Sequence, residues 1–68
     1  MKLVFQNSQG HERTIADVET ADEAYSEIKN FCNERNFHIY YVRVWQDGDG
    51  ATVYDVGAWN EKFRLIKE

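Results

Sequence analysis

Apolar and polar positions change their spacing along the 68-residue chain, and each spacing predicts a different element. Residues 2–6 are β-branched and aromatic around Leu3-Val4-Phe5, which predicts a short strand. The turn cluster Asn7-Ser8-Gln9-Gly10 follows, and an alternating pattern resumes over residues 13–18. Two such strands joined by a short loop that contains a glycine predict an antiparallel hairpin.

Residues 20–32 carry the pattern of an amphipathic helix. Thr20 and Glu23 have the spacing of a capping box, with Thr20 as the N-cap. Apolar side chains then recur three or four positions apart, as one helix face requires. They are Ala21, Ala24, Tyr25, Ile28, Phe31 and Cys32. We expect a helix of about twelve or thirteen residues that ends near 33–36, where asparagines tolerate a left-handed C-cap.

The spacing changes again after the helix. Residues 37–45 are rich in β-branched and aromatic side chains at both parities, which predicts a central strand. Asp47-Gly48-Asp49-Gly50 predicts a tight hairpin turn, and residues 52–56 predict the returning strand. A loop over residues 58–61 leads to a last strand at 62–66. The element order is therefore ββαβββ.

This order predicts one small α+β domain over residues 1–68, with a single helix packed on one face of a four- to five-stranded, mostly antiparallel sheet. The helix leaves the other face of the sheet uncovered. The spacing assigns Ile39, Tyr41, Arg43 and Trp45 to the uncovered face, and the opposite parity would place Tyr40, Val42 and Val44 there.

Composition limits the classes of protein to consider. Hydrophobic residues make up 43% and charged residues 29%, which is not the composition of a disordered chain. No apolar run approaches the roughly 18–20 residues of a membrane span, and the first residues turn polar too early for a signal peptide. The net charge of -4 disfavours a nucleic-acid partner for the molecule as a whole. The single cysteine excludes an intramolecular disulfide and favours a cytoplasmic location.

The sequence predicts no catalytic residue, metal site or cofactor. Cys32 lies on the apolar stripe at the helix C-terminal end, where the dipole disfavours a thiolate, so we expect a buried structural cysteine. Asp47, Asp49 and Gly50 are similar to the start of a calcium loop, but position 12 of that loop would be Ala58 instead of a glutamate. The chain is therefore not expected to be an enzyme.

Two groups of residues are candidate interaction surfaces. The first is an aromatic sheet face, which could form core or self-association contacts, bind a protein partner, or stack single-stranded bases. Its members are Tyr41, Arg43, Trp45, Tyr54 and Trp59. The second is an acidic run, which is either a solvated helix start or a mimic of nucleic-acid phosphates. Its members are Asp17, Glu19, Asp22, Glu23 and Glu27.

Two runs of the C-terminal half carry a family pattern: Tyr40-Tyr41-Val42-Arg43-Val44-Trp45, and Tyr54-Asp55-Val56-Gly57-Ala58-Trp59-Asn60-Glu61-Lys62-Phe63. This pattern resembles small uncharacterised proteins of phages and prophages of Gram-positive bacteria, which pair a YYxRVW strand with a later DVGSxxEFFYI segment. The resemblance covers nearly the whole chain, because the helix also falls in the expected place. Ala58 stands where the family has serine, and Lys62 and Arg64 stand where it has aromatic residues.

The resemblance implies a phage context and transfers no site, because that family has no assigned activity. The sequence therefore predicts a non-enzymatic accessory protein of phage type, acting through protein contacts or self-association at the aromatic sheet face. The first alternative is an acidic inhibitor or nucleic-acid mimic that uses the acidic run. The second alternative is a weak binder of single-stranded nucleic acid.

Overall fold

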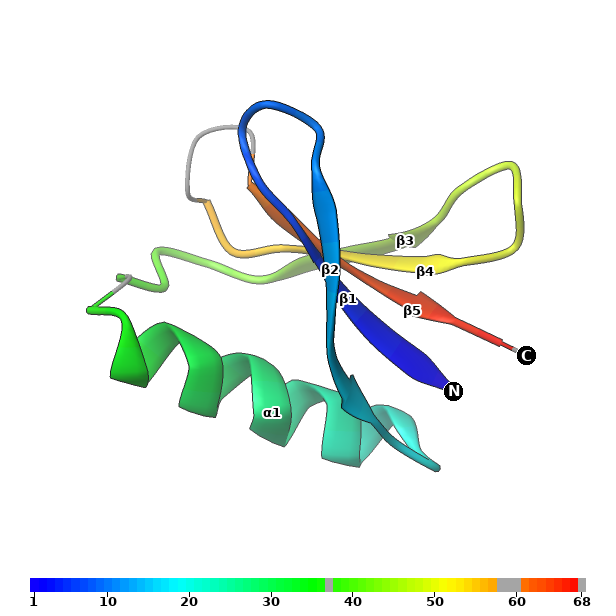
Figure 1. Ribbon diagram of the computed structural model, residues 1–68, viewed down its shortest axis with the longest axis horizontal. Helices are drawn as coiled ribbons and strands as arrows, with labels where there is room; N and C mark the ends of the chain where they lie inside the picture. The colour runs from blue at the N-terminus through cyan, green and yellow to red at the C-terminus, as the bar shows by residue number, and fades with distance from the viewer. Residues whose placement is uncertain (37, 58–60, 68) are drawn as a thin grey trace.

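The computed structural model describes residues 1–36, 38–57 and 61–67. Within these residues one helix and five strands follow each other in the order ββαβββ (Figure 1). They are β1 Lys2–Gln6, β2 Glu12–Asp17, α1 Ala21–Glu34, β3 Arg43–Gln46, β4 Thr52–Asp55 and β5 Lys62–Ile66. The α+β class and the position of the helix between the second and third strands are as the sequence predicts.

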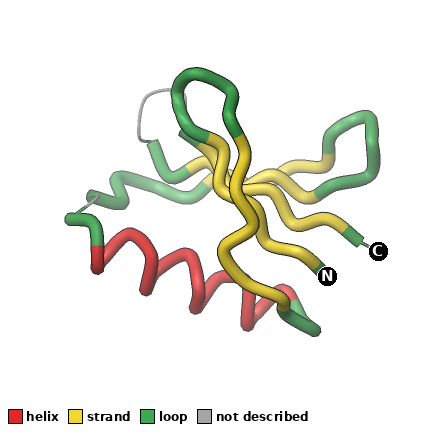
Figure 2. Tube along the Cα trace, viewed as in Figure 1, coloured by secondary structure: helices red, strands yellow, loops and turns green. Residues whose placement is uncertain are grey.

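The strands form one antiparallel sheet in the order β2-β1-β5-β4-β3, and α1 lies against one of its faces (Figure 2). The last strand, β5, therefore lies at the centre, paired with β1 on one side and β4 on the other. Its residues alternate between buried and half-buried, because one side of β5 faces α1 and the other faces away from it. We call the sheet face opposite α1 the open face.

Both hairpins turn in the same way. In the β1–β2 turn, Asn7 Oδ1 accepts hydrogen bonds from the backbone N–H of Gln9 and His11, at 2.9 and 3.0 Å. In the β3–β4 turn, Asp47 Oδ1 accepts the corresponding bonds from Asp49 and Ala51, at 3.0 and 3.1 Å. Each turn then closes through a glycine with φ near +85°: Gly10 with φ 85 and Gly50 with φ 84.

The helix begins and ends where the sequence predicts. Thr20 is the N-cap, and its Oγ1 accepts the N–H of Glu23 at 3.1 Å, while the Glu23 carboxylate accepts the N–H of Glu19 at 3.3 Å. The helix ends at Glu34, and Asn36 adopts a left-handed conformation with φ 58.

The core lies between α1 and the sheet. Its helix side chains are Ala24, Ile28, Phe31 and Cys32, all part of the predicted apolar stripe. Phe63 from β5 is 1% exposed and lies with its ring edge against Phe31 at 5.5 Å between ring centroids. The expectation that Cys32 is buried is confirmed, since it is 1% exposed. Tyr25 is 39% exposed, so the buried face is narrower than the predicted stripe.

The expected central strand over residues 37–45 is wrong. The strand comprises only Arg43–Gln46, and it lies at an edge of the sheet. Within the described part of the preceding segment, Tyr40 donates its N–H to the Val56 carbonyl at 3.1 Å, and Ile39 and Val42 pack against the core. Apolar side chains occur at both parities because this segment leaves the ladder and packs over the end of the sheet. Phe37 lies outside the described residues.

Candidate functional site: the open face and the β3 edge

The strand register assigns side chains to the open face. Residues paired across antiparallel strands lie on the same face, and one row runs Val4, Arg64, Val53 and Trp45. The neighbouring row runs Phe5, Phe63, Tyr54 and Val44, and Phe63 and Tyr54 belong to the core under α1. Arg43 and Trp45 therefore lie on the open face, which is the parity that the sequence assigned to it.

Arg64 covers the middle of the open face. It stands in register between Val4 and Val53, which are 5% and 4% exposed although they lie opposite the helix. The aliphatic stem of an arginine shields such neighbours from water while its guanidinium stays polar. At the centre of the sheet, the side chain of Arg64 therefore covers the open face.

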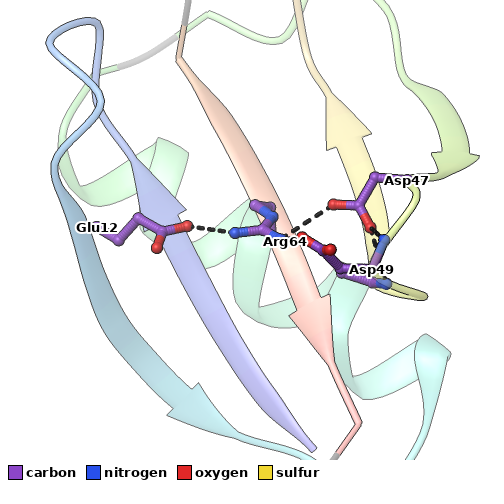
Figure 3. A network of polar contacts seen from close by, with 5 residues as sticks. Glu12, Asp47, Asp49 and Arg64 are labelled. Atoms are coloured by element: carbon purple, nitrogen blue, oxygen red, sulfur yellow. Dashed lines mark hydrogen bonds and ion pairs between the residues drawn. The ribbon is translucent and has the colours of Figure 1, made fainter.

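Three carboxylates surround the Arg64 guanidinium (Figure 3). Glu12 of β2 lies 2.6 Å away on one side, and Asp47 and Asp49 of the β3–β4 turn lie 3.0 and 3.7 Å away on the other. The hydrogen bonds to Glu12 and Asp47, together with the charges of these two carboxylates, raise the pKa of Arg64 against an opposing effect of burial. Because its partners already neutralise it, Arg64 is poorly suited to bind phosphate.

Asp47 has two roles in this network. Burial alone would raise the pKa of its carboxyl group, but hydrogen bonds from the N–H groups of Asp49 and Ala51, together with Arg64, outweigh that effect and lower the pKa below its ordinary value of 3.8. The same carboxylate therefore closes the turn and holds the arginine. The sequence predicted the turn, while the contact to Arg64 joins residues 17 positions apart.

Aromatic rings and cations alternate along one side of the open face. The Arg43 guanidinium carbon lies 5.7 Å from the centre of the Tyr41 ring and 5.9 Å from that of Trp45. The Lys62 Nζ lies 5.8 Å from the centre of the Trp45 ring. These are cation–π distances, so the Trp45 ring interacts with two positive charges. We call Tyr41, Arg43, Trp45 and Lys62 the cation–π row.

Asp55 binds the arginine of the cation–π row. Its Oδ2 accepts a hydrogen bond from Arg43 at 3.3 Å, and its Oδ1 accepts the N–H of Gly57 at 2.9 Å. Asp55 is 7% exposed, and its two carboxylate oxygens thus each have a partner. The orientation of Arg43 against the two rings is therefore set by a buried carboxylate on the neighbouring strand.

The segment Tyr40–Gln46 exposes more large apolar surface than any other described part of the chain. Among the described residues the exposed large hydrophobic side chains are Tyr25, Tyr40, Tyr41, Val44 and Trp45. Four of these fall within six consecutive positions, with Tyr40 at 69% and Val44 at 55% exposure. All of β3 is exposed, and β3 is the last strand on its side of the sheet. We call residues Tyr40–Gln46 the β3 edge.

Two members of the predicted aromatic face are not part of this surface. Tyr54 is 5% exposed and lies in the core beneath α1, so its assignment to the interaction face is wrong. The reason is parity, because Tyr54 pairs with Val44 and with Phe63 on the helix side of the sheet. Trp59 lies outside the described residues. Sequence reasoning missed Lys62 as a partner of Trp45. The two residues belong to β5 and β3, which are brought near each other only because both strands pair with β4.

The predicted acidic surface is exposed at all its positions: Asp17, Glu19, Asp22, Glu23 and Glu27. Two of these carboxylates have local partners. Asp17 lies 3.5 Å from the N-terminal ammonium, and the Glu23 carboxylate accepts the N–H of Glu19. Asp22, Glu27 and Glu19 have no hydrogen bond or ion pair of the carboxylate among the described residues.

Other chemistry is sparse in the described residues. No group of three or more potential ligands gathers there to hold a metal ion. Burial, and to a smaller extent Glu61, raises the pKa of the Cys32 thiol, so it remains protonated.

A depression of about 370 Å³ on the open face is lined by Trp45, Lys62 and Arg64 together with Asp47 and Asp49, so charges of both signs meet there. None of the described helices has the length and apolar character needed to cross a membrane.

Comparison of the chain with protein-family models, curated proteins and solved structures finds no match.

Proposed function

We propose that this chain is a non-enzymatic interaction protein that binds a protein partner through the β3 edge. The observation that carries the proposal is the concentration of exposed Tyr40, Tyr41, Val44 and Trp45 on the edge strand β3 and the segment directly before it. Unpaired strand edges with apolar side chains are surfaces to which another strand is readily added. The resemblance to phage and prophage proteins supports an accessory role of this kind in the cytoplasm.

The acidic surface is a second candidate, favoured by the exposure of all five of its carboxylates. In this function the chain would occupy the nucleic-acid groove of a basic partner. The β3 edge is the stronger candidate, because Glu23 and Asp17 already have local partners that account for their positions. Direct binding of single-stranded nucleic acid has the least support, since Arg64 is surrounded by carboxylates.

One experiment distinguishes the two surfaces. A photo-cross-linking aromatic amino acid replaces Tyr40 in one variant, Glu27 in a second and Ser8 in a third, each at an exposed position. The chain is irradiated inside the cells that produce it. We expect a discrete protein adduct from position 40 and none from position 8. An adduct from position 27 alone would support the acidic surface, and equal labelling at all three positions would refute a specific β3-edge interaction.

A further inference from the structure

The outer side of β3 presents backbone groups that no described strand uses. Asp47 donates its N–H to the Ala51 carbonyl across the hairpin, at 3.0 Å. In an antiparallel pair, successive residues direct their N–H and C=O groups alternately toward one side and the other. The groups of Arg43 and Trp45 therefore face β4, and those of Val44 and Gln46 face away from the sheet.

We infer that a second copy of this chain pairs with this edge, the two β3 strands running antiparallel about a two-fold axis at Val44. This inference rests on the proposed function and names its partner. Val44 exchanges two backbone hydrogen bonds with Val44 of the second copy, because its N–H and C=O both face outward. Two five-stranded sheets then join into one continuous sheet, with both helices on the same side.

The side chains fit this register. With Val44 opposite its own copy, Arg43 lies opposite Trp45 of the second copy on the open face, and Trp45 lies opposite the second Arg43. The contact repeats between chains the Arg43–Trp45 cation–π pair that each chain already contains, at 5.9 Å. On the helix side, Val44 meets Val44, and its 55% exposure shows that α1 does not cover this position.

Neighbouring registers are disfavoured by the same geometry. A shift by one residue would place open-face side chains opposite helix-face side chains, which antiparallel pairing does not allow. A two-fold axis at Trp45 would also use the outward groups of Val44 and Gln46, but it would set each Trp45 opposite its own copy and lose the pairing of Arg43 with Trp45. The pairing of Arg43 with Trp45 therefore favours the axis at Val44.

The charge distribution also favours a second copy at this edge. Residues 37–46 contain no aspartate or glutamate, in a chain that has twelve. Two acidic chains can thus approach each other here without placing carboxylates against carboxylates. The opposite edge, β2, carries Glu12, Arg13 and Asp17 among its six residues, and charges on an edge strand oppose pairing. A closed dimer through β3 results, not an open filament.

The test measures mass in solution across a hundredfold dilution, by light scattering and sedimentation, for the parent chain, Val44→Lys and Thr14→Lys. Val44→Lys places two ammonium groups opposite each other at the axis. Thr14→Lys is the matched control, because Thr14 is exposed on β2 and its backbone groups also face outward. Circular dichroism confirms that each variant is folded.

We expect the parent to reach twice the 8.0 kDa mass of the chain, with a dissociation constant that Val44→Lys raises by about tenfold or more and Thr14→Lys leaves unchanged. In the unmodified parent, the amide hydrogen of Val44 should exchange more slowly at high than at low protein concentration. A monomer at every concentration, or equal weakening by both lysines, overturns self-pairing. If such a monomer still captures another protein from position 40, the proposed function stands and only the second copy is refuted.

Discussion

Arg64 shows how one residue can close a sheet face in a small domain. It lies between two valines on the central strand and holds carboxylates from β2 and from the β3–β4 turn. An apolar side chain at this position would cover the same valines but would not link β2 to the β3–β4 turn. Because Glu12 and Asp47 lie on opposite sides of β5, the arginine links β2 to the β3–β4 turn across the sheet (Figure 3).

The pH dependence of stability tests the role of Asp47. A carboxyl group whose pKa is lower in the folded than in the unfolded state stabilises the fold fully above the ordinary value of 3.8, and this contribution is lost as the pH falls through the folded value. Asp47→Asn keeps the turn acceptor, as Asn7 does in the other hairpin, and removes the charge. We expect the variant to be less stable than the parent at neutral pH, with the difference shrinking below 3.8.

Urea denaturation of both proteins from about pH 7 to about pH 3 measures this difference. Asp49→Asn is the control, since the Asp49 side chain is 87% exposed and lies 3.7 Å from Arg64. It should change stability little at any pH. A pH-independent difference for Asp47→Asn would show that the turn, and not the ion pair, accounts for the effect.

At the scale of the elements, turns and ends decide the arrangement more than strand propensity does. Gly10 and Gly50 each close a hairpin with positive φ, while Gly57 ends the β4 segment with φ 84 under the two tyrosines of the β3 edge. A Cβ at Gly57 would lie 2.9 Å from Tyr41 Cε2 and 3.1 Å from Tyr40 Cβ. Because Gly57 has no Cβ, the segment before β3 can pack close to the end of β4.

Replacing two of these glycines separates conformational strain from crowding. Gly10→Ala meets nothing within 4 Å and should cost only the left-handed backbone strain, about 1–2 kcal/mol. Gly57→Ala has the same φ and must also displace the tyrosines, so we expect a larger loss of stability and altered Tyr40 and Tyr41 signals in NMR spectra. Equal losses for the two variants would argue against close packing at Gly57.

At the scale of the whole molecule, a single layer of core carries the stability. The helix side chains meet Leu3, Phe63 and Leu65 on one face of the sheet, and the open face adds only a thin cover of long polar side chains. A domain of this size rarely has more than about 3–5 kcal/mol of stability. Any loss of packing under α1 is therefore a large share of the total.

Ile28→Ala tests this dependence on one core layer. Ile28 is 0% exposed, so the truncation should cost about 2–5 kcal/mol and leave the protein close to unfolding. Ser26→Ala, at an exposed position of the same helix, should change stability by less than about 0.5 kcal/mol. Thermal and urea unfolding compare the two. Similar unfolding midpoints would contradict the burial of Ile28.

The elements that depend on local interactions can be predicted from the sequence alone. The capped helix, both hairpin turns and the fifth strand follow from spacing, capping residues and turn residues that act within a few positions. The folded chain is needed to establish which strand is central, which sheet face Arg43 and Trp45 occupy, and that residues 38–42 leave the ladder. It is also needed to establish that Tyr54 is buried and that Arg64 joins Glu12 to Asp47. These features arise from pairing between distant segments, which spacing along a single strand does not encode.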